Sequence, residues 1–313
     1  MVRSSQGHSP VQAGFGWGRT ANLYCGPGGR KMRVVVTGSS GQIGRYIVKD
    51  LVAAKHDVLA VDIRPVPSEG ARTMTVDLTD AGQVYGALGR FQANAVIHMG
   101  AWANPGVVAD TKTYGDNVQG TFNLFQACAD LGIQRVVSAS SAQVYGFHEH
   151  APIYVRVDES HPLKPINCYA LSKVAGEQAG EYFSRCFGMT VLSFRFQGVR
   201  VPADLDDQIE RISEDPHGGR RQFWTRTDAR DAAMACRLAV EAERVDPGPY
   251  NITGPRVVLG TPVPELLNAH YEEKVEIRET QDDWKSPLSC ERARKAFGYE
   301  PRYPWTVDDR FPE

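Results

Sequence analysis

The sequence has no long apolar run, no closely spaced cysteine pair and no strong excess of charge. No hydrophobic stretch approaches the roughly 20 residues that a membrane-spanning helix needs, so we expect no membrane partner. The six cysteines are scattered without a CxxC pair or a metal-ligand spacing, which predicts reduced thiols in a cytoplasmic protein that binds no metal. The formal net charge of −2 gives no electrostatic reason to expect a nucleic-acid partner.

The first 31 residues contain no acidic side chain. They hold four basic residues, many glycines and serines, and no periodic apolar pattern. We therefore predict that residues 1–31 form a disordered extension. Because Met32 leads directly into an apolar strand, we expect Met32 to be the natural start, and the segment has no apolar core typical of a secretory signal.

A glycine-rich turn dominates the start of the remaining chain. The run Val34–Val36 indicates a buried strand, glycines follow at 38, 41 and 44, and the next residues have the spacing of an amphipathic helix. Glycines in this order permit a sharp turn, a close approach of backbone to a pyrophosphate, and close packing of helix on strand. A second predicted strand ends at Asp62, 18 residues after Gly44, near the place of a carboxylate that binds the adenosine ribose.

Strands and helices alternate from residue 32 to about residue 195. The predicted strands are 33–37, 57–62, 72–76, 94–98, 134–140 and 189–195, and the predicted helices between them are 42–54, 80–89, 111–131 and 167–187. The alternation predicts an α/β fold, a Rossmann-type doubly wound parallel sheet with helices on both faces. We assign residues 32–195 to a dinucleotide-binding domain and 196–313 to a small C-terminal substrate lobe.

The alternation ends after about residue 196. Residues 200–222 are polar and contain two prolines and a glycine pair, so we predict a loop there. Further elements are expected as helices at 226–243, 262–271 and 289–297, and as strands at 250–252 and 274–278.

Three side chains have the character of a proton-transfer set. Tyr169 and Lys173 are four residues apart, which places them on one face of a helix. A nearby ammonium stabilises a phenolate and can bind a nicotinamide ribose, while a hydroxyl at the end of the strand 134–140 can contact the reacting oxygen.

Taken together, these segments resemble extended short-chain dehydrogenases/reductases of the NAD-dependent epimerase/dehydratase family. The resemblance covers residues 32 to about 305 and is most specific up to residue 195. It rests on the segments 37–44, 76–78, 96–101, 117–121 and 140–146, on Asp62, Tyr169 and Lys173, and more loosely on 194–196, 230–233, 250–252 and 297–301.

The resemblance implies a bound NAD and a role for each matching position. The pyrophosphate would lie on the glycine turn, the adenosine ribose on Asp62, and the adenine between Asp77 and Leu78. We expect NAD rather than NADP because a carboxylate repels a 2′-phosphate, although Arg64 could instead attract one. The full set of implied cofactor residues is Gly38, Gly41, Gln42, Ile43, Gly44, Asp62, Arg64, Asp77, Leu78, Gly100, Ala101, Asn117, Tyr169 and Lys173.

The resemblance also implies the catalytic roles. Ser141 would be the hydroxyl partner, Tyr169 the general acid/base, and Lys173 its electrostatic partner. His98, in an apolar strand, is expected to be a buried core histidine rather than a catalytic one.

Departures from the family pattern narrow the reaction. Ala142 and Gln143 stand where 4,6-dehydratases carry an Asp-Glu pair, so the elimination has no acid and base. Only 29 residues separate Arg195 from Trp224, which resembles the shorter lobe of uronate-dehydrogenase-like enzymes and suggests a small substrate. Arg195 could hold a carboxylate or form a structural ion pair. The predicted substrate-binding residues are Trp102, Ser141, Gln143, Arg195, Trp224 and Arg230.

These observations leave three hypotheses. The first is an NAD-dependent oxidoreductase that takes a hydride from a sugar, sugar acid or related polyhydroxy compound. The alternative is a nucleotide-sugar epimerase, similar to UDP-glucose 4-epimerase, with tightly bound NAD. A cofactor-binding regulator without turnover is disfavoured because Tyr169 and Lys173 are both present. By resemblance we expect a homodimer that packs through helices 111–131 and 167–187.

Overall fold

The computed structural model describes residues 31–278 and 282–305. The extension predicted over residues 1–31 lies outside the described residues, apart from Lys31. The boundary expected between residues 195 and 196 stays a prediction.

Seven parallel strands form the central sheet, in the order β3-β2-β1-β4-β5-β7-β10. From β1 the chain winds outward to β2 and β3, and β4 then begins the other half, so the winding reverses between β1 and β4. Ligands of such sheets bind beyond the carboxyl ends of the strands at this reversal. The strands are β1 (Arg33–Thr37), β2 (Asp57–Asp62), β3 (Arg72–Thr75), β4 (Ala95–His98), β5 (Arg135–Ser141), β7 (Thr190–Phe196) and β10 (Gly248–Ile252).

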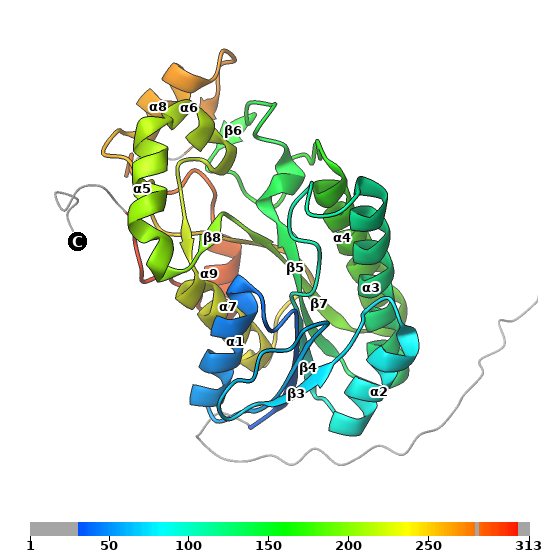
Figure 1. Cartoon of the computed structure of the whole chain (residues 1–313). Coiled ribbons are helices and arrows are strands. Elements are labelled where there is room, and N and C mark those ends of the chain that lie inside the picture. Colours follow the sequence, from blue (N-terminus) through cyan, green and yellow to red (C-terminus); the bar gives the residue numbers. More distant parts are fainter. Residues whose placement is uncertain (1–30, 279–281, 306–313) are drawn as a thin grey trace, which may run out of the picture. The chain divides into compact units, whose positions relative to one another are not determined.

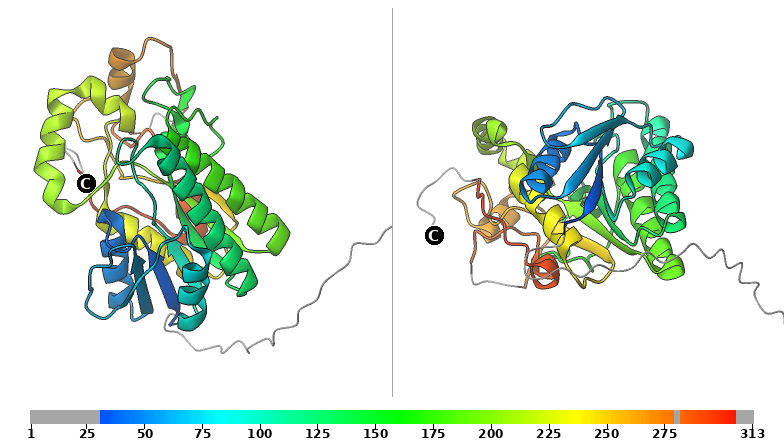
Figure 2. Two further views of the ribbon diagram at one scale, coloured as in Figure 1. Left: turned by 45° about the vertical axis from the view of Figure 1, so that its right-hand side comes forward. Right: turned by 90° about the horizontal axis from the view of Figure 1, so that it is seen from below.

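Helices cover both faces of this sheet (Figures 1 and 2). One face carries α2 (Ala81–Phe91), α3 (Asp110–Asp130) and α4 (Cys168–Phe187), and the other carries α1 (Gln42–Ala53), α7 (Ala229–Glu241) and α9 (Glu291–Phe297). The predicted Rossmann-type doubly wound fold is therefore confirmed. In the described part of the chain, no helix is long and apolar enough to cross a membrane.

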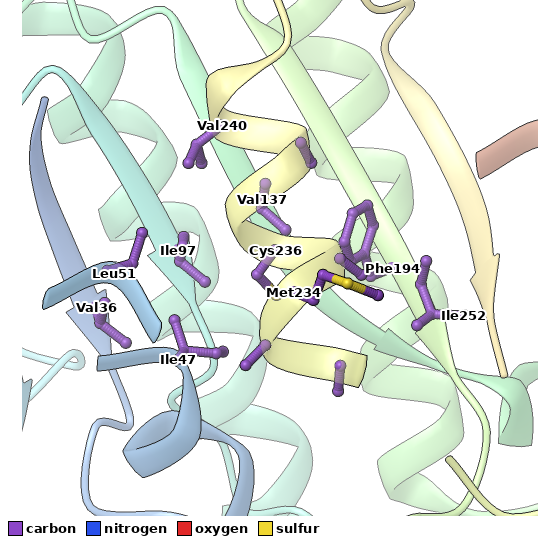
Figure 3. Close-up of a cluster of buried hydrophobic side chains, with 14 of the residues drawn as sticks. Val36, Ile47, Leu51, Ile97, Val137, Phe194, Met234, Cys236, Val240 and Ile252 are labelled. Atoms are coloured by element: carbon purple, nitrogen blue, oxygen red, sulfur yellow. The ribbon is translucent and has the colours of Figure 1, made fainter. Parts of the chain in front are cut away.

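The core on the α1 and α7 face shows why the central strands are continuous apolar runs. Val36, Ile97 and Val137 point from β1, β4 and β5 toward Ile47 of α1 and Cys236 of α7 (Figure 3). A second cluster fills the space between the sheet and α2, α3 and α4. Strands buried on both faces need side chains that are apolar in both directions, which is the pattern of Val34–Val36.

A smaller lobe stands over the carboxyl ends of the strands and has its own apolar cluster. Among the described residues, it consists of two short parallel strand pairs, three helices and three 3-10 turns. Its elements are η1 (Ala142–Tyr145), β6 (Tyr154–Val155), β8 (Val199–Arg200), η2 (Pro202–Asp204), α5 (Leu205–Glu214), α6 (Pro216–Gly219), η3 (Arg220–Gln222), β9 (Thr227–Asp228), α8 (Val263–His270) and β11 (Glu276–Ile277).

The loop predicted over residues 200–222 is wrong, because this segment contains α5, α6 and two 3-10 turns. In α5 only Gln208 and Ile212 are buried, so a narrow apolar contact among many charged residues gives a weak periodic signal. Asp215 then accepts a hydrogen bond from the Gly218 amide at 2.8 Å and caps α6, which holds the glycine pair in a helical turn.

Candidate functional site

A cavity of about 580 Å³ opens at the carboxyl ends of the strands, where the winding of the sheet reverses. Most of the predicted site residues line it. They are Gly38, Gly41, Gln42, Ile43, Gly44, Asp62, Asp77, Leu78, Gly100, Ala101, Trp102, Asn117, Ser141, Gln143, Tyr169 and Lys173. Four predicted residues, Arg64, Arg195, Trp224 and Arg230, do not line it.

The glycine turn is shaped so that side chains would not fit. Gly38 has a φ of +63°, and a Cβ there would lie 2.6 Å from the Gly100 nitrogen. A Cβ on Gly44 would lie 2.1 Å from the Gly38 carbonyl oxygen. The turn therefore presents bare backbone and the start of α1 to the cavity, a cradle that suits a pyrophosphate.

Asp62 lies at the end of β2 with its carboxylate held in place by backbone. One oxygen accepts from the Ser40 amide and the other from the Arg64 amide, each at 3.1 Å. Asp77, beyond β3, is held by the backbone and the hydroxyl of Thr79. The Arg64 side chain is exposed outside the cavity, whereas Asp62 lines it, so the structure does not place Arg64 to attract a 2′-phosphate.

Asn117 of α3 holds the loop that follows β4. Its amide oxygen accepts from the Trp102 backbone at 2.8 Å, and its Nδ2 donates to the Trp102 carbonyl at 3.1 Å and to the Ser172 hydroxyl at 3.0 Å. The Trp102 indole donates to Asp116 at 2.8 Å. Asn117 thus joins the loop after β4 to α4, and Trp102 and Asn104 of this loop line the cavity.

Only one of the two serines at the end of β5 is placed for chemistry. The Ser140 hydroxyl donates to Glu177 at 2.5 Å, whereas the Ser141 hydroxyl accepts from the Gln143 amide at 3.2 Å and begins η1. Ser141 also forms a side-chain hydrogen bond with Tyr169 that lowers the pKa of the phenol. The phenol and the Ser141 hydroxyl therefore face one another in the cavity.

Tyr169 and Lys173 lie in the first turns of α4 and are both buried. The Lys173 Nζ is 5.5 Å from the centre of the Tyr169 ring. Burial raises the pKa of Tyr169 to about 12 and lowers the pKa of Lys173 to about 8, because desolvation disfavours whichever form is charged. The arrangement can move a proton to or from a group that lies between Tyr169 and Ser141.

His98 has the environment expected of a core histidine. Its ring nitrogens hydrogen-bond to Thr37 at 2.8 Å and Thr121 at 3.1 Å. Burial and the charge of Lys173 lower the pKa of His98 to about 3, so the ring is neutral near pH 7. His98 does not line the cavity.

Arg195 is not available to a substrate carboxylate. Its guanidinium donates to both carboxylate oxygens of Glu177, at 2.9 and 2.7 Å, and to the Tyr145 hydroxyl at 2.9 Å. Only 3% of Arg195 is exposed. Of the two alternatives for Arg195, the structural ion pair is therefore correct, and its acid is Glu177. The Arg195 guanidinium already makes with Glu177 the two parallel hydrogen bonds that it would need to bind a substrate carboxylate.

The structure also contradicts the predicted substrate-binding roles of Trp224 and Arg230. Trp224 is fully buried in the apolar cluster of the lobe, and its indole donates to the Pro216 carbonyl at 2.6 Å. Arg230 pairs with Asp228 at 2.8 Å and lies over the Tyr303 ring, 3.5 Å from its centre. Both side chains hold the lobe together and do not line the cavity.

The sequence prediction missed the cavity wall built after β7. Gln197, Arg200, Arg221 and Gln222 line this wall. Arg200 belongs to the two-residue strand β8, which is too short to give a periodic signal. Residues 220–222 lay in the segment predicted to be a loop. Arg221 and Gln222 therefore reach the cavity wall only because of the way η3 folds back toward the cavity.

Known proteins resemble this chain over much of its length. The model of a family described as the NAD dependent epimerase/dehydratase family matches residues 34–253. An L-arabinose 1-dehydrogenase (NAD(P)(+)) of Haloferax volcanii is 29% identical over 86% of this chain and 96% of its own length. A uronate dehydrogenase of Pseudomonas putida is 28% identical over 67% of this chain and 88% of its own. A UDP-glucose 4-epimerase of Lactobacillus helveticus is 31% identical, but over 54% of this chain and 52% of its own.

Solved structures support the fold. A short-chain dehydrogenase/reductase superfamily protein from Agrobacterium tumefaciens, solved with bound NAD, aligns with a TM-score of 0.69 at 23% identity. The alignment covers 87% of this chain and 93% of that chain. At this identity the likeness concerns the fold, and the arrangement of the cavity is this chain's own.

Proposed function

Because the chain belongs to the NAD-dependent epimerase/dehydratase family, we propose that it is an NAD-dependent dehydrogenase of a sugar, sugar acid or related polyhydroxy compound. The observation that carries this proposal is the meeting of Tyr169 with Ser141, beside Lys173, in the same cavity as the glycine turn and Asp62. The relatives that align over 96% and 88% of their own length are named L-arabinose 1-dehydrogenase (NAD(P)(+)) and uronate dehydrogenase, which supports the substrate class.

The residues present fit NAD. The bare backbone at Gly38 and Gly44 would hold the pyrophosphate, Asp62 the ribose hydroxyls, and Lys173 the ribose next to the nicotinamide. When bound, the nicotinamide supplies the hydride acceptor. We propose NAD over NADP because Asp62 lines the cavity and would repel a 2′-phosphate, whereas Arg64 does not line it.

In the proposed reaction, Ser141 orients the substrate hydroxyl by a hydrogen bond. Tyr169 takes the proton of that hydroxyl as its carbon is oxidised, and the ammonium of Lys173 stabilises the phenolate that this requires. In the reverse direction Tyr169 returns the proton. Each of the three groups is 7% exposed, and the part that remains open faces the cavity.

A panel of aldoses, uronates and nucleotide sugars with NAD and NADP tests this proposal. We expect NADH to accumulate with at least one aldose or uronate, and the Tyr169→Phe protein to lose about 10²- to 10⁴-fold in kcat. Tyr46→Phe is the matched control, because Tyr46 lies on α1 outside the cavity. Full activity of Tyr169→Phe would refute the catalytic assignment.

The same assay separates the epimerase alternative. An epimerase would convert a nucleotide sugar without net NADH, since its cofactor is oxidised again before product leaves. The UDP-glucose 4-epimerase relative aligns over about half of its length, which gives this alternative less support.

We further propose a homodimer that packs through α3 and α4. Phe122 of α3 and Tyr182 and Phe187 of α4 are 46, 42 and 41% exposed, an apolar surface that a partner helix pair would cover. Light scattering should give a dimer for the natural protein and a monomer for Phe122→Glu.

Location in the cytoplasm stays a prediction. Cys25 lies outside the described residues, and the other five cysteines are free.

A further inference from the structure

The described chain after α9 is firmly held although it forms neither helix nor strand. Tyr299 and Trp305, at the two ends of the segment 299–305, are 1% and 2% exposed. The Tyr299 hydroxyl donates to the Thr253 carbonyl at 2.9 Å, just beyond β10, whereas Trp305 packs in the apolar cluster of the lobe. We call residues 299–305 the strap, because they connect the sheet with the lobe.

The middle of the strap is fixed to the first turn of α7. The backbone amides of Arg302 and Tyr303 donate to the two carboxylate oxygens of Asp231, at 2.9 and 3.0 Å. Asp231 is fully buried, and hydrogen bonds to an ionised acceptor are stronger than those between neutral groups. The strap therefore cannot move far from the start of α7 without exposing or stranding a buried carboxylate.

The end of the strap reaches a second buried carboxylate, that of Asp228. This side chain caps α7 by accepting from the Arg230 amide at 2.8 Å, and it pairs with the Arg230 guanidinium through both oxygens. The Trp305 indole donates to Oδ2 of Asp228 at 3.1 Å. Loss of a donor to a fully buried acceptor is costly, so the orientation of Asp228 depends on the Trp305 indole.

Asp228 belongs to β9, and the strand that pairs with β9 lines the cavity. Asp228 lies opposite Arg200 in the parallel β8–β9 pair. The next residue pair joins Thr227 to Val199, and the Thr227 hydroxyl also donates to the Gln197 carbonyl at 2.5 Å. Gln197, Val199 and Arg200 all line the cavity. A continuous series of contacts thus leads from the strap through β9 to the cavity wall.

We propose that the strap positions the cavity wall that follows β7, and that Trp305 is a positioning residue acting through Asp228. The structure describes the whole strap, and no residue of it lines the cavity, so its effect needs no contact with a ligand. A pair of two-residue strands is weak by itself, which makes its geometry dependent on what holds β9. The consequence for turnover rests on the proposed function, whereas the consequence for the wall rests on the contacts alone.

Two substitutions of tryptophan by phenylalanine form a matched pair. Trp305→Phe removes the indole donor and keeps an aromatic ring in the cluster. Trp284→Phe is the control, because its indole donates to the Gly260 carbonyl at 3.3 Å in the same lobe and both residues lie outside the cavity. Asp231→Asn is a second strap variant that leaves the aromatic packing in place, in case Trp305→Phe does not fold.

Hydrogen exchange measured by mass spectrometry tests the positioning without any turnover. The amides of residues 197–200 should exchange about 5- to 30-fold faster in Trp305→Phe than in the natural protein, as expected for loss of one hydrogen bond to a buried charge. Asp231→Asn should act in the same direction. Trp284→Phe should leave these amides within about twofold of the natural protein.

Steady-state kinetics with the sugar that the panel identifies test the consequence for catalysis. In the sheet, β7 and β2 lie on opposite sides of β1 and β4, so the wall after β7 is far from Asp62 and lies on the side left for the sugar. Trp305→Phe should raise KM for the sugar about 3- to 10-fold and leave kcat within about twofold. A merely stabilising role would reduce the amount of folded enzyme and leave KM unchanged.

A double-mutant cycle tests whether the effect passes through β9. Thr227→Val removes the hydroxyl that bonds the Gln197 carbonyl, keeps the size of the side chain and leaves the strap untouched. It should also raise KM, and the double variant with Trp305→Phe should raise KM by less than the product of the two single effects, since the two residues act on one strand pair.

Four outcomes decide the proposal. Unchanged exchange of residues 197–200 in Trp305→Phe, an unchanged KM in an active enzyme, or single effects on KM that multiply in the double variant would each overturn it. Faster exchange in a protein that forms NADH with no sugar of the panel would support the strap and refute the proposed function instead.

Discussion

At the scale of single residues, burial changes the proton affinities of Tyr169 and Lys173 in opposite directions. It raises the pKa of Tyr169 to about 12, although the hydrogen bond with Ser141 acts in the opposite direction, and lowers the pKa of Lys173 to about 8. Each charged form is therefore costly until substrate or cofactor surrounds it. At neutral pH, where Tyr169 is uncharged, the buried ammonium of Lys173 is thus a source of instability in the folded protein.

Lys173→Met should make the protein more stable near neutral pH. The folded state releases the Lys173 proton near pH 8 and the unfolded state near pH 10.5, so the natural protein gains stability as the pH rises through this window. The shift corresponds to about 3 kcal/mol. Urea unfolding at pH 7.5 and pH 10 should give the Met variant an advantage that shrinks at the higher pH.

The comparison between the natural protein and Lys173→Met isolates the effect of Lys173 on stability, because the tyrosines that titrate at high pH are common to both proteins. An advantage of the Met variant that is the same at pH 7.5 and pH 10 would show that packing, rather than the buried charge, accounts for it.

At the scale of elements, the sequence predicts the central sheet well and the lobe poorly. The expected strands and helices up to β7 end within two residues of those observed, because buried runs of branched residues and long amphipathic helices give strong periodic signals. Two-residue strands such as β6 and β8, and the largely charged α5, give almost none.

Side-chain pairing is the part of the site that the sequence could not supply. Arg195 and Glu177 are 18 positions apart, on β7 and α4, and no spacing rule links them. Most residues expected at the cofactor line the cavity, since most of them lie at the end of a strand or at the start of the following helix. The cavity wall formed by Gln197, Arg200, Arg221 and Gln222 depends on how β8 and η3 fold over the cavity, so it appears only in three dimensions.

The start of α4 links helix stability to catalysis through Asn167. Its side chain accepts from the Ala170 amide at 2.8 Å and donates to Gln143 at 3.3 Å. Asn167→Ala should lower the free energy of unfolding by about 1 kcal/mol and also lower kcat, because Tyr169 lies in the turn that loses its cap. Chemical denaturation and NADH kinetics measure the two effects.

Asp80→Ala is the matched control, since Asp80 caps α2 outside the cavity by accepting from the Gln83 amide at 3.1 Å. It should lose similar stability with unchanged kcat. Equal effects of both variants on kcat would argue against a positional role of the α4 cap.

At the scale of the whole molecule, the carboxylates of Asp62, at the end of β2, and Asp77, beyond β3, both line the cavity. Asp62→Ala should weaken NAD binding about tenfold, as loss of a charge-assisted hydrogen bond does, and should reduce discrimination against NADP. Fluorescence titration with both cofactors measures this. Asp57→Ala, at the far end of the same strand, should leave both affinities unchanged.

The tie between Glu177 and Arg195 has a consequence for how such an enzyme can diversify. Ser140 and Arg195 reach Glu177 from neighbouring strands, and Glu177 lies one helical turn beyond Lys173. The spacing between the serine strand and the tyrosine helix is thus set by hydrogen bonds and an ion pair within the protein. Substitutions along β8 and η3 can therefore exchange one sugar for another while the proton-transfer machinery keeps its dimensions.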